Sequence, residues 1–377
     1  MSELVNLVVD LDERYASDAA ARERLTQAGF TLEVASGASD RVLAWIDDRF
    51  GGAWSSEAMR SMNAVAWREG APAGFVSFDA QGLRYAWLRG VAREPQVGVF
   101  GPFGVDESAR GGVLGLALLE IALCGLRARG YRRALIAAAN DGLVPYYTQH
   151  AGARVVERFD PRSFTPSRVR TVVLASGSGT NFQAVIDRSS DGLPLELCAL
   201  VSNRPHAFAV ERARLAGVRA VVLPWERAAQ SRAQYDAHLL DTVKRCEPEL
   251  VLLLGWMHLL EPAFVDAFAT TLNVHPAFLP LDPDADDVGM PDGTIIPAFR
   301  GARAIADALA TESPWIGASV HAVTAQTDRG AIFVRKPLRV QPGEDEAEVL
   351  ARLHPIEHRL VEGGIRRWLH ERAFAIS

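Results

Sequence analysis

Four short apolar runs, separated by helical stretches, constrain the fold of the second half of this chain. They span residues 171–174, 197–201, 220–223 and 250–254, and they consist mostly of Val, Leu and Ala. Uninterrupted apolar strands that alternate with helices are typical of a parallel sheet covered on both faces. We therefore predict a doubly wound, mostly parallel α/β sheet here, with ligands bound at the carboxyl ends of its strands.

Length and turn-forming residues divide the chain into two domains. Its 377 residues exceed what one hydrophobic core usually serves. The stretch at 159–167 holds two prolines and two serines, so it continues neither a helix nor a central strand. We predict a first domain at 1–158, a linker at 159–169 and a second domain at 170–377.

Composition narrows the class of protein. The net charge of −6 argues against a protein that grips nucleic-acid backbones. No apolar run reaches the length of a membrane span, and the start of the chain lacks the basic region of a signal peptide. Cys124, Cys198 and Cys246 are far apart, which favours reduced thiols over a disulfide or zinc framework. We expect a cytoplasmic protein that binds neither nucleic acid nor a membrane.

A Gly/Ser loop follows the first apolar run and opens a helical stretch. It reads Ala175-Ser176-Gly177-Ser178-Gly179-Thr180-Asn181. Glycines let the backbone approach a ligand, and the free N–H groups of a helix start attract an anion such as phosphate. The loop fits neither the dinucleotide fingerprint nor the P-loop pattern. Taken alone, it leaves a phosphate site and an ordinary turn equally open.

Asn273 and His275 stand two residues apart at the end of another strand-like run. Strand alternation places both on the same side. An amide and an imidazole aimed at one carbonyl oxygen stabilise the charge that develops there and relay a proton. A nearby carboxylate raises the imidazole pKa or orders a water molecule. An isolated Asn-x-His pair is more often structural than catalytic, so the flanking sequence has to distinguish between these two roles.

The context of this pair closely resembles the folate-dependent formyltransferases. Residues 272–280 (LNVHPAFLP) resemble the family signature, and 327–330 (TDRG) resemble its loop with the catalytic aspartate. Residues 178–184 and 201–208 resemble the glycinamide ribonucleotide (GAR) formyltransferases in particular. The resemblance runs from about residue 170 to 369, with the motifs in the family's order.

This resemblance implies a role for each matching residue. The co-substrate is 10-formyltetrahydrofolate, the acceptor is GAR, and no metal is required. The substrate phosphate is held by Gly177, Ser178, Gly179, Thr180 and Asn181, and catalysis falls to Asn273, His275 and Asp328. Glu357 contacts the substrate amine or ribose, and His321 supports the aspartate or is merely a core histidine. Folate is bound by Met257, His258, Leu259, Leu260 and Arg232. The family often has arginine where His258 stands, which leaves the contact with the folate glutamate tail open.

An insert at 281–297 interrupts the family pattern. It carries five aspartates, Asp282, Asp284, Asp286, Asp287 and Asp292. Their spacing lacks the glycine and glutamate of a calcium-binding EF-hand loop. We therefore predict a solvated hairpin that turns at 291–293. Because the insert leaves from the catalytic strand, we expect it to cap the folate entrance.

The first domain resembles the GNAT N-acetyltransferases, which implies a GNAT-like α+β fold. The resemblance rests on a strand at 97–105, a helix at 116–129 and a strand at 133–138. Arg110, Gly111, Gly112 and Gly115 resemble the turn that holds the pyrophosphate of acetyl-CoA, and Tyr147 resembles the tyrosine acid. Val113 stands where the family has glycine. Two alternatives stay open: an acetyl-CoA-dependent enzyme, or a degenerate module for docking or homodimer formation.

Four other functions are weighed for the second domain. A formyltetrahydrofolate hydrolase usually carries a small regulatory domain in front, which residues 1–159 do not resemble. Amino-sugar formyltransferases lack this form of the phosphate loop, and a tRNA-directed formyltransferase would favour a basic surface. A non-catalytic sensor is disfavoured because Asn273, His275 and Asp328 are all present.

Overall fold

The chain forms two compact units. The computed structural model describes residues 3–83, 85, 87, 88, 90–164 and 168–376. Unit 1 comprises residues 1–165, 291–294 and 369–377, and unit 2 comprises residues 166–290 and 295–368. The first division falls inside the stretch predicted as a linker, between strand β7, which ends at Phe159, and strand β8, which begins at Val169. Residues 165–167 of that stretch lie outside the described residues.

Unit 2 is built on a seven-stranded sheet in the order β10-β9-β8-β11-β12-β15-β16. The first five strands in this order run parallel, and β15 and β16 are antiparallel additions. The strands are β8 (Val169–Leu174), β9 (Leu195–Ser202), β10 (Ala220–Val222), β11 (Leu250–Leu253), β12 (Thr271–His275), β15 (Trp315–Ala322) and β16 (Ile332–Arg339). The mostly parallel α/β sheet predicted from the apolar runs is confirmed.

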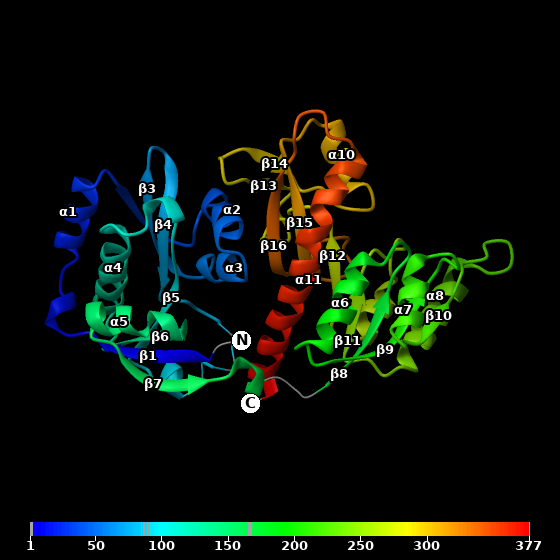
Figure 1. The fold of residues 1–377 in the computed structure, drawn as a ribbon, viewed down its shortest axis with the longest axis horizontal. Helices are drawn as coiled ribbons and strands as arrows, with labels where there is room; N and C mark the ends of the chain where they lie inside the picture. Colours follow the sequence, from blue (N-terminus) through cyan, green and yellow to red (C-terminus); the bar gives the residue numbers. More distant parts are fainter. Residues whose placement is uncertain (1–2, 84, 86, 89, 165–167, 377) are drawn as a thin grey trace. The chain divides into compact units, whose positions relative to one another are not determined.

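Helices cover both faces of this sheet, as burial of its strands requires (Figure 1). They are α6 (Thr180–Ser190), α7 (Phe208–Leu215), α8 (Arg232–Lys244), α9 (Pro262–Ala267), α10 (Ala304–Ala310) and α11 (Glu346–Ile376). The long helix α11 packs closely on β15, because a Cβ added at Gly364 would lie 2.6 Å from Val320. Glycine therefore sets how closely this helix approaches the sheet.

The insert forms a two-stranded hairpin, as predicted. Its strands are β13 (Asp287–Gly289) and β14 (Ile295–Pro297), paired antiparallel. In the turn, the Asp292 carboxylate accepts a hydrogen bond of 3.0 Å from the Thr294 N–H, and Gly293 has a φ of +88°. Both features are typical of a turn built from Asp and Gly.

Unit 1 is an α+β unit on a second seven-stranded sheet, ordered β2-β3-β4-β5-β6-β1-β7. Its strands are β1 (Leu4–Asp10), β2 (Thr31–Ser36), β3 (Met62–Arg68), β4 (Ala71–Phe78), β5 (Val97–Val105), β6 (Arg133–Asn140) and β7 (Arg154–Phe159). Neighbours are antiparallel except for β5 and β6, which run parallel. The helices are α1 (Ala19–Gln27), α2 (Asp40–Arg49), α3 (Trp54–Ala58), α4 (Leu114–Ala128) and α5 (Val144–Ala151).

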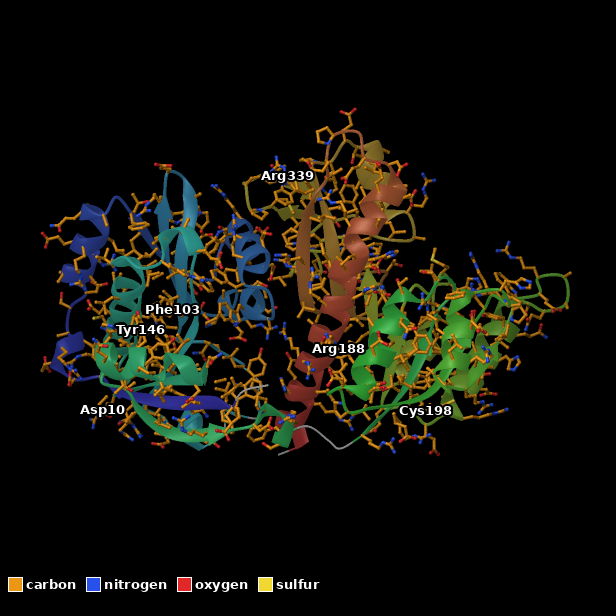
Figure 2. The ribbon with its side chains drawn as sticks, in the orientation of Figure 1. Asp10, Phe103, Tyr146, Arg188, Cys198 and Arg339 are labelled. Carbon is orange, nitrogen blue, oxygen red and sulfur yellow. The ribbon has the colours of Figure 1, made fainter. Side chains whose placement is uncertain are left out.

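The core of unit 1 centres on α4, whose residues are almost all apolar. The helix lies so close to β4 that a Cβ added at Gly125 would come within 2.5 Å of the Phe78 ring. In the same core, Phe103 of β5 and Tyr146 of α5 both approach Gly115 near the start of α4 (Figure 2). Within the described residues, no helix is long and apolar enough to cross a membrane.

Candidate active site

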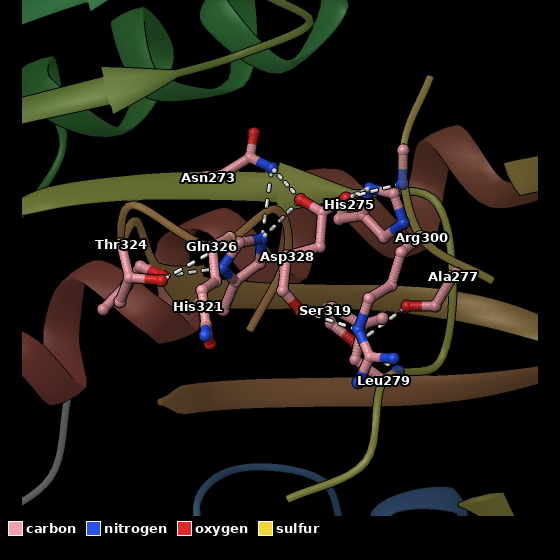
Figure 3. Close-up of polar contacts among 12 residues, drawn as sticks. Asn273, His275, Ala277, Leu279, Arg300, Ser319, His321, Thr324, Gln326 and Asp328 are labelled. Atoms are coloured by element: carbon pink, nitrogen blue, oxygen red, sulfur yellow. Dashed lines mark hydrogen bonds and ion pairs between the residues drawn. The ribbon is translucent and has the colours of Figure 1, made fainter. Parts of the chain in front are cut away.

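Strand β12 carries Asn273 and His275 to the carboxyl end of the parallel sheet. It pairs in parallel with β11 and antiparallel with β15, which sets Asn273 opposite His321 and His275 opposite Ser319. The Ser319 hydroxyl accepts from the N–H of Leu279 at 3.0 Å and donates to the carbonyl of Ala277 at 2.8 Å. These two bonds hold the chain that follows His275, and Figure 3 shows the resulting cluster.

The amide of Asn273 is oriented by its neighbours. Its Nδ2 lies 3.1 Å from Nε2 of His321 and 3.4 Å from Oδ1 of Asp328 (Figure 3). His321 is buried, and its Nδ1 lies 2.7 Å from the carbonyl of Ala322. Because that carbonyl can only accept, the Nδ1 of His321 donates, and in the neutral ring Nε2 accepts from Asn273. Strand pairing therefore makes His321 a support for the Asn273 amide.

His275 is almost fully buried, and its two ring nitrogens have different partners. Nε2 lies 2.8 Å from the carbonyl of Phe299, so Nε2 carries the proton. Nδ1 faces Oδ2 of Asp328 at 3.6 Å, beyond hydrogen-bond distance. Burial lowers the pKa of His275 below its ordinary value, although the Asp328 carboxylate acts in the opposite direction. The resting ring is thus neutral, with the lone pair on Nδ1.

Asp328 reaches the cluster from the loop after β15. Its Oδ2 accepts a 2.7 Å hydrogen bond from the Gly301 N–H, and Oδ1 lies 3.4 Å from Nε2 of His321. Burial by itself raises the pKa of Asp328, but its interactions with His321 and His275 and the hydrogen bond from the Gly301 N–H outweigh this effect. The net pKa lies well below the usual range, so the group stays ionised. Its φ of +53° is a conformation that aspartate tolerates better than most residues.

The predicted phosphate loop joins β8 to α6. Gly179 precedes the first residue of α6 with a φ of +69°, and the side chain of Ser176 accepts a 3.1 Å bond from the Met257 N–H. Residues of this loop and of the segment after β9 line one pocket, namely Ser176, Gly177, Ser178, Arg204, Pro205, His206, Ala207 and Phe208. A helix start and two exposed basic side chains meet there, which suits an anion.

Replacing Gly179 by alanine is expected to cost about 1–3 kcal/mol of folding free energy. The positive φ strains any side chain, and a Cβ would lie 2.7 Å from that of Ala209. Thermal or urea unfolding measures the loss. Gly177→Ala is the matched control, because its φ is not positive and a Cβ there meets no atom within 4 Å. Equal stability of the two variants would contradict this reading of the loop.

Asn181 and Glu357 meet although 176 residues separate them. The Asn181 amide donates to a Glu357 carboxylate oxygen at 3.0 Å. Glu357 lies on α11, and its side chain is buried. Burial raises the pKa of Glu357, and the bond from Asn181 partly offsets this. The structure thereby brings the predicted amine or ribose contact beside the predicted phosphate loop.

The predicted folate segment follows β11. Met257 and Leu259 expose 49% and 68% of their surface, so apolar side chains face solvent on both sides of His258. His258 instead turns inward, with its ring 5.6–5.9 Å from those of Trp225, Tyr235 and Trp256, and its Nε2 lies 3.0 Å from the Asn203 amide. Burial lowers the pKa of His258, so the imidazole is neutral where it packs against these aromatic rings.

Arg232, the second residue predicted at the folate tail, supports this segment. Its guanidinium donates to the carbonyl of Leu259 and pairs with Asp236 at 2.6 Å. It also lies over the Trp225 ring at 5.2 Å. The side chain is therefore anchored between α8 and the segment that carries Leu259. Leu260 packs with the core of unit 2.

The residues predicted for acyl-CoA lie at the start of α4 in unit 1. Gly111, with a φ of +79°, and Gly112 have open space around them, and Arg110 donates to the carbonyl of Val105 at 3.2 Å. Gly115 faces the Tyr146 hydroxyl. Tyr147 is buried against Phe100, and burial raises its pKa above the usual value.

Several functional groups were not predicted from the sequence. The Gly301 N–H and the Phe299 carbonyl are backbone groups, and residue types say nothing about where such groups point. Arg204 and His206 line the anion pocket, and their basic character just after a strand was an available signal. Arg300, which donates to the carbonyl of Asp328 at 3.3 Å, was also missed.

The fold and this cluster define an α/β enzyme with an Asn-His-Asp centre at the end of a parallel sheet. The sequence profile of the formyl transferase family matches residues 169–282 and 293–363. Phosphoribosylglycinamide formyltransferase of Escherichia coli is 34% identical over 191 residues, which are 50% of this chain and 82% of that protein. The enzyme of the same name from Mycobacterium tuberculosis is 32% identical over 55% of this chain and 88% of its own. This chain belongs to the formyl transferase family.

Two further similarities concern the same half of the chain. The trifunctional purine biosynthetic protein adenosine-3 of Drosophila melanogaster is 32% identical over 213 residues, which are 55% of this chain and 14% of that protein. The crystal structure of glycinamide ribonucleotide transformylase 1 from Symbiobacterium toebii matches with a TM-score of 0.47. It is 33% identical and covers 54% of this chain and 88% of its own.

Proposed function

We propose that unit 2 transfers the formyl group of 10-formyltetrahydrofolate to the glycine amine of GAR, a step of de novo purine biosynthesis. The observation that carries this proposal is the Asn273-His275-Asp328 cluster, placed on the same sheet edge as an anion pocket. The similarity to the bacterial phosphoribosylglycinamide formyltransferases supports this choice of acceptor. The folate supplies an activated formyl group, so no metal is needed.

In the proposed reaction, a C–N bond forms between the amine and the formyl carbon while the bond from that carbon to N10 of the folate breaks. Negative charge gathers on the formyl oxygen. One Nδ2 hydrogen of Asn273 stabilises this charge in place of its long 3.4 Å contact with Asp328, while the other is bonded to His321, which holds the amide in place. Because the amide is already oriented, it does not have to reorganise as the charge develops.

His275 moves the proton. Its Nδ1 is unprotonated in the resting ring, so it accepts the proton released by the amine, directly or through a water that Asp328 orients. The resulting imidazolium is stabilised by the Asp328 carboxylate 3.6 Å away, and it also faces the charge on the formyl oxygen. The proton then passes to N10, so that one amine proton is lost and one N10 proton is gained.

The remaining residues position the two substrates. Gly177, Ser178, Gly179, Thr180 and Asn181, with Arg204 and His206, form the phosphate site. Glu357 accepts from the amine or ribose. The exposed side chains of Met257 and Leu259 fit the apolar face of a pterin, which would cover them. We place the reaction in the cytoplasm.

A direct assay tests this function. Full-length protein is mixed with GAR and 10-formyltetrahydrofolate, and the absorbance change of folate deformylation is followed together with formyl-GAR by mass spectrometry. Folate deformylation that proceeds equally well without GAR would instead indicate a formyltetrahydrofolate hydrolase. Neither product at any substrate concentration would reject formyl transfer altogether.

For unit 1 we propose a GNAT-like module that binds acetyl-CoA. The supporting observation is the parallel pair β5 and β6, whose pairing ends at Phe100 and Ile136 although the strands continue to Val105 and Asn140. Where two strands separate in this way, backbone groups that no longer pair across the gap can bind a ligand, here beside the glycines that precede α4. The other function considered is docking, including homodimer formation.

Isothermal titration with acetyl-CoA separates these two functions. Saturable binding by the full chain, weakened in Gly112→Asp, supports the acetyl-CoA module, because an added carboxylate repels a pyrophosphate. No heat of binding, together with a dimer mass by light scattering, supports docking instead. Circular dichroism and thermal unfolding of the full chain serve as the control that both preparations are folded.

A further inference from the structure

The segment at 283–292 has no counterpart in the family match, which stops at residue 282 and resumes at 293. Its first residues, Pro283 to Asp286, form the base of the β13–β14 hairpin and belong to unit 2. The base contacts two arginines that flank the catalytic aspartate, Arg300 beside it in space and Arg329 next to it in sequence. An element outside the family match therefore touches the catalytic loop.

Both arginines donate hydrogen bonds to backbone carbonyls in the base of the hairpin. Arg300 donates from Nη2 to the carbonyl of Ala285 at 2.7 Å, and Arg329 donates from Nη1 to the carbonyl of Pro283 at 2.8 Å. Both guanidinium groups also converge on Oδ1 of Asp286, at 3.2 Å from Arg300 and 2.5 Å from Arg329. Among the described residues, Asp286 is thus the one carboxylate that both cations contact.

Arg300 also holds the loop of Asp328, and Arg329 belongs to that loop. Nε of Arg300 donates to the Asp328 carbonyl at 3.3 Å, and the following residue, Gly301, donates its N–H to the Asp328 side chain at 2.7 Å. Figure 3 shows Arg300 and Asp328 together in the cluster. The positive φ of Asp328 has to be maintained by such surrounding contacts, because it is intrinsically unfavourable.

Charge explains why Asp286 matters although its own side chain is 75% exposed. The side chains of Arg300 and Arg329 expose only 14% and 27% of their surface. Two poorly solvated cations that share one partner repel each other, and the carboxylate offsets this repulsion. Without it, we expect Arg300 to move toward solvent and to lose its bond to the Asp328 carbonyl.

We propose that Asp286 is a positioning residue for formyl transfer, which acts through Arg300 and Arg329 to hold the Asp328 loop in its catalytic geometry. The inserted hairpin thereby affects the rate of the chemical step, in addition to the expected capping of the folate entrance. This proposal rests on the proposed formyl transfer. Its mechanism predicts a loss in kcat, because Asp286 touches neither the anion pocket nor the exposed apolar residues of the folate segment.

The test compares Asp286→Asn, which keeps the size and removes the charge, with Asp286→Glu and Asp284→Asn. Asp284 is exposed, and its side chain forms no ion pair with any residue that the structure describes. We expect kcat of Asp286→Asn to fall roughly tenfold, as for small misplacements of a catalytic group, with KM for GAR unchanged. Asp286→Glu should recover part of this loss, and Asp284→Asn should match the wild type.

A double variant identifies the route. If Asp286 acts by offsetting the repulsion between Arg300 and Arg329, then Asp286→Asn adds nothing to the loss already caused by Arg329→Gln, in which that repulsion is absent. Additive losses, or a kcat of Asp286→Asn within twofold of the wild type, would overturn the proposal. Activity is divided by the folded fraction from circular dichroism, so a folding defect is not mistaken for a catalytic one. An inactive wild type would reject the formyl transfer itself.

Discussion

His275→Ala is expected to lower kcat for formyl transfer by about a thousandfold, the usual scale for loss of a general acid–base together with a transition-state contact. The substitution removes the only Nδ1 that faces Asp328 among the described residues. KM for GAR should change little, because the phosphate loop and Glu357 do not contact this ring. Steady-state kinetics with both substrates varied in turn makes the measurement.

The matched control for this variant is His238→Ala. His238 is an exposed histidine on α8, so its removal changes the composition in the same way without affecting the site. Because His275→Ala leaves a buried cavity and an unpaired Phe299 carbonyl, its folded fraction has to be measured as well. A folded His275→Ala protein that retains a tenth of the wild-type kcat would exclude the proposed proton route.

Asp328→Asn is expected to lower kcat by about a hundredfold or more. Asparagine keeps the size of the side chain and tolerates the positive φ, so the loop is preserved. Its amide cannot accept at both ends, however, whereas Asp328 accepts from Gly301 at one oxygen and faces the Asn273 Nδ2 with the other. The NH2 group of the new asparagine must therefore face either the Gly301 N–H or the Asn273 NH2 group, and neither can accept a hydrogen bond.

The pH dependence of kcat distinguishes this charge effect from a simple distortion. Neutral His275 is the active form, and burial lowers its pKa below the ordinary value. Activity should therefore fall only as the pH drops below about 6.5, the reference pKa of histidine. The carboxylate of Asp328 opposes this lowering, so Asp328→Asn should move the acid limb to still lower pH. Gln326 is exposed in the same loop, so Gln326→Ala should leave the acid limb of the kcat–pH profile unchanged. If the acid limb of Asp328→Asn also stayed at the wild-type pH, the proposed electrostatic role would be contradicted.

Much of unit 2 was predictable because local rules govern it. Apolar runs without alternation indicate strands buried on both faces, and every such run is a strand of the parallel sheet. The antiparallel strands β15 and β16 were not predicted, although Trp315–Ala322 is also apolar and buried. Parallel and antiparallel pairing use the same residue types, so the direction of a neighbour depends on the connections between strands.

The least predictable side chains are those whose environment comes from distant segments. His258 was expected to face the folate, yet the rings of Trp225, Tyr235 and Trp256 surround it. Arg232 was expected to meet the folate tail, yet Asp236 and the Leu259 carbonyl hold it. Their roles toward folate stay predictions, because in both cases the partners lie on several elements whose packing the residue itself does not indicate.

The sequence by itself determined the strand-loop-helix that presents the phosphate loop and the pair Asn273 and His275 on one side of a strand. These features depend on neighbours within a few residues, where alternation and glycine geometry act directly. Only the tertiary structure decided that His321 lies opposite Asn273, that Glu357 meets Asn181, and that Asp286 joins Arg300 and Arg329. Each of these contacts depends on strand register or on packing between remote segments, because residues far apart in the sequence meet only when the strands pair in one register and the segments pack together.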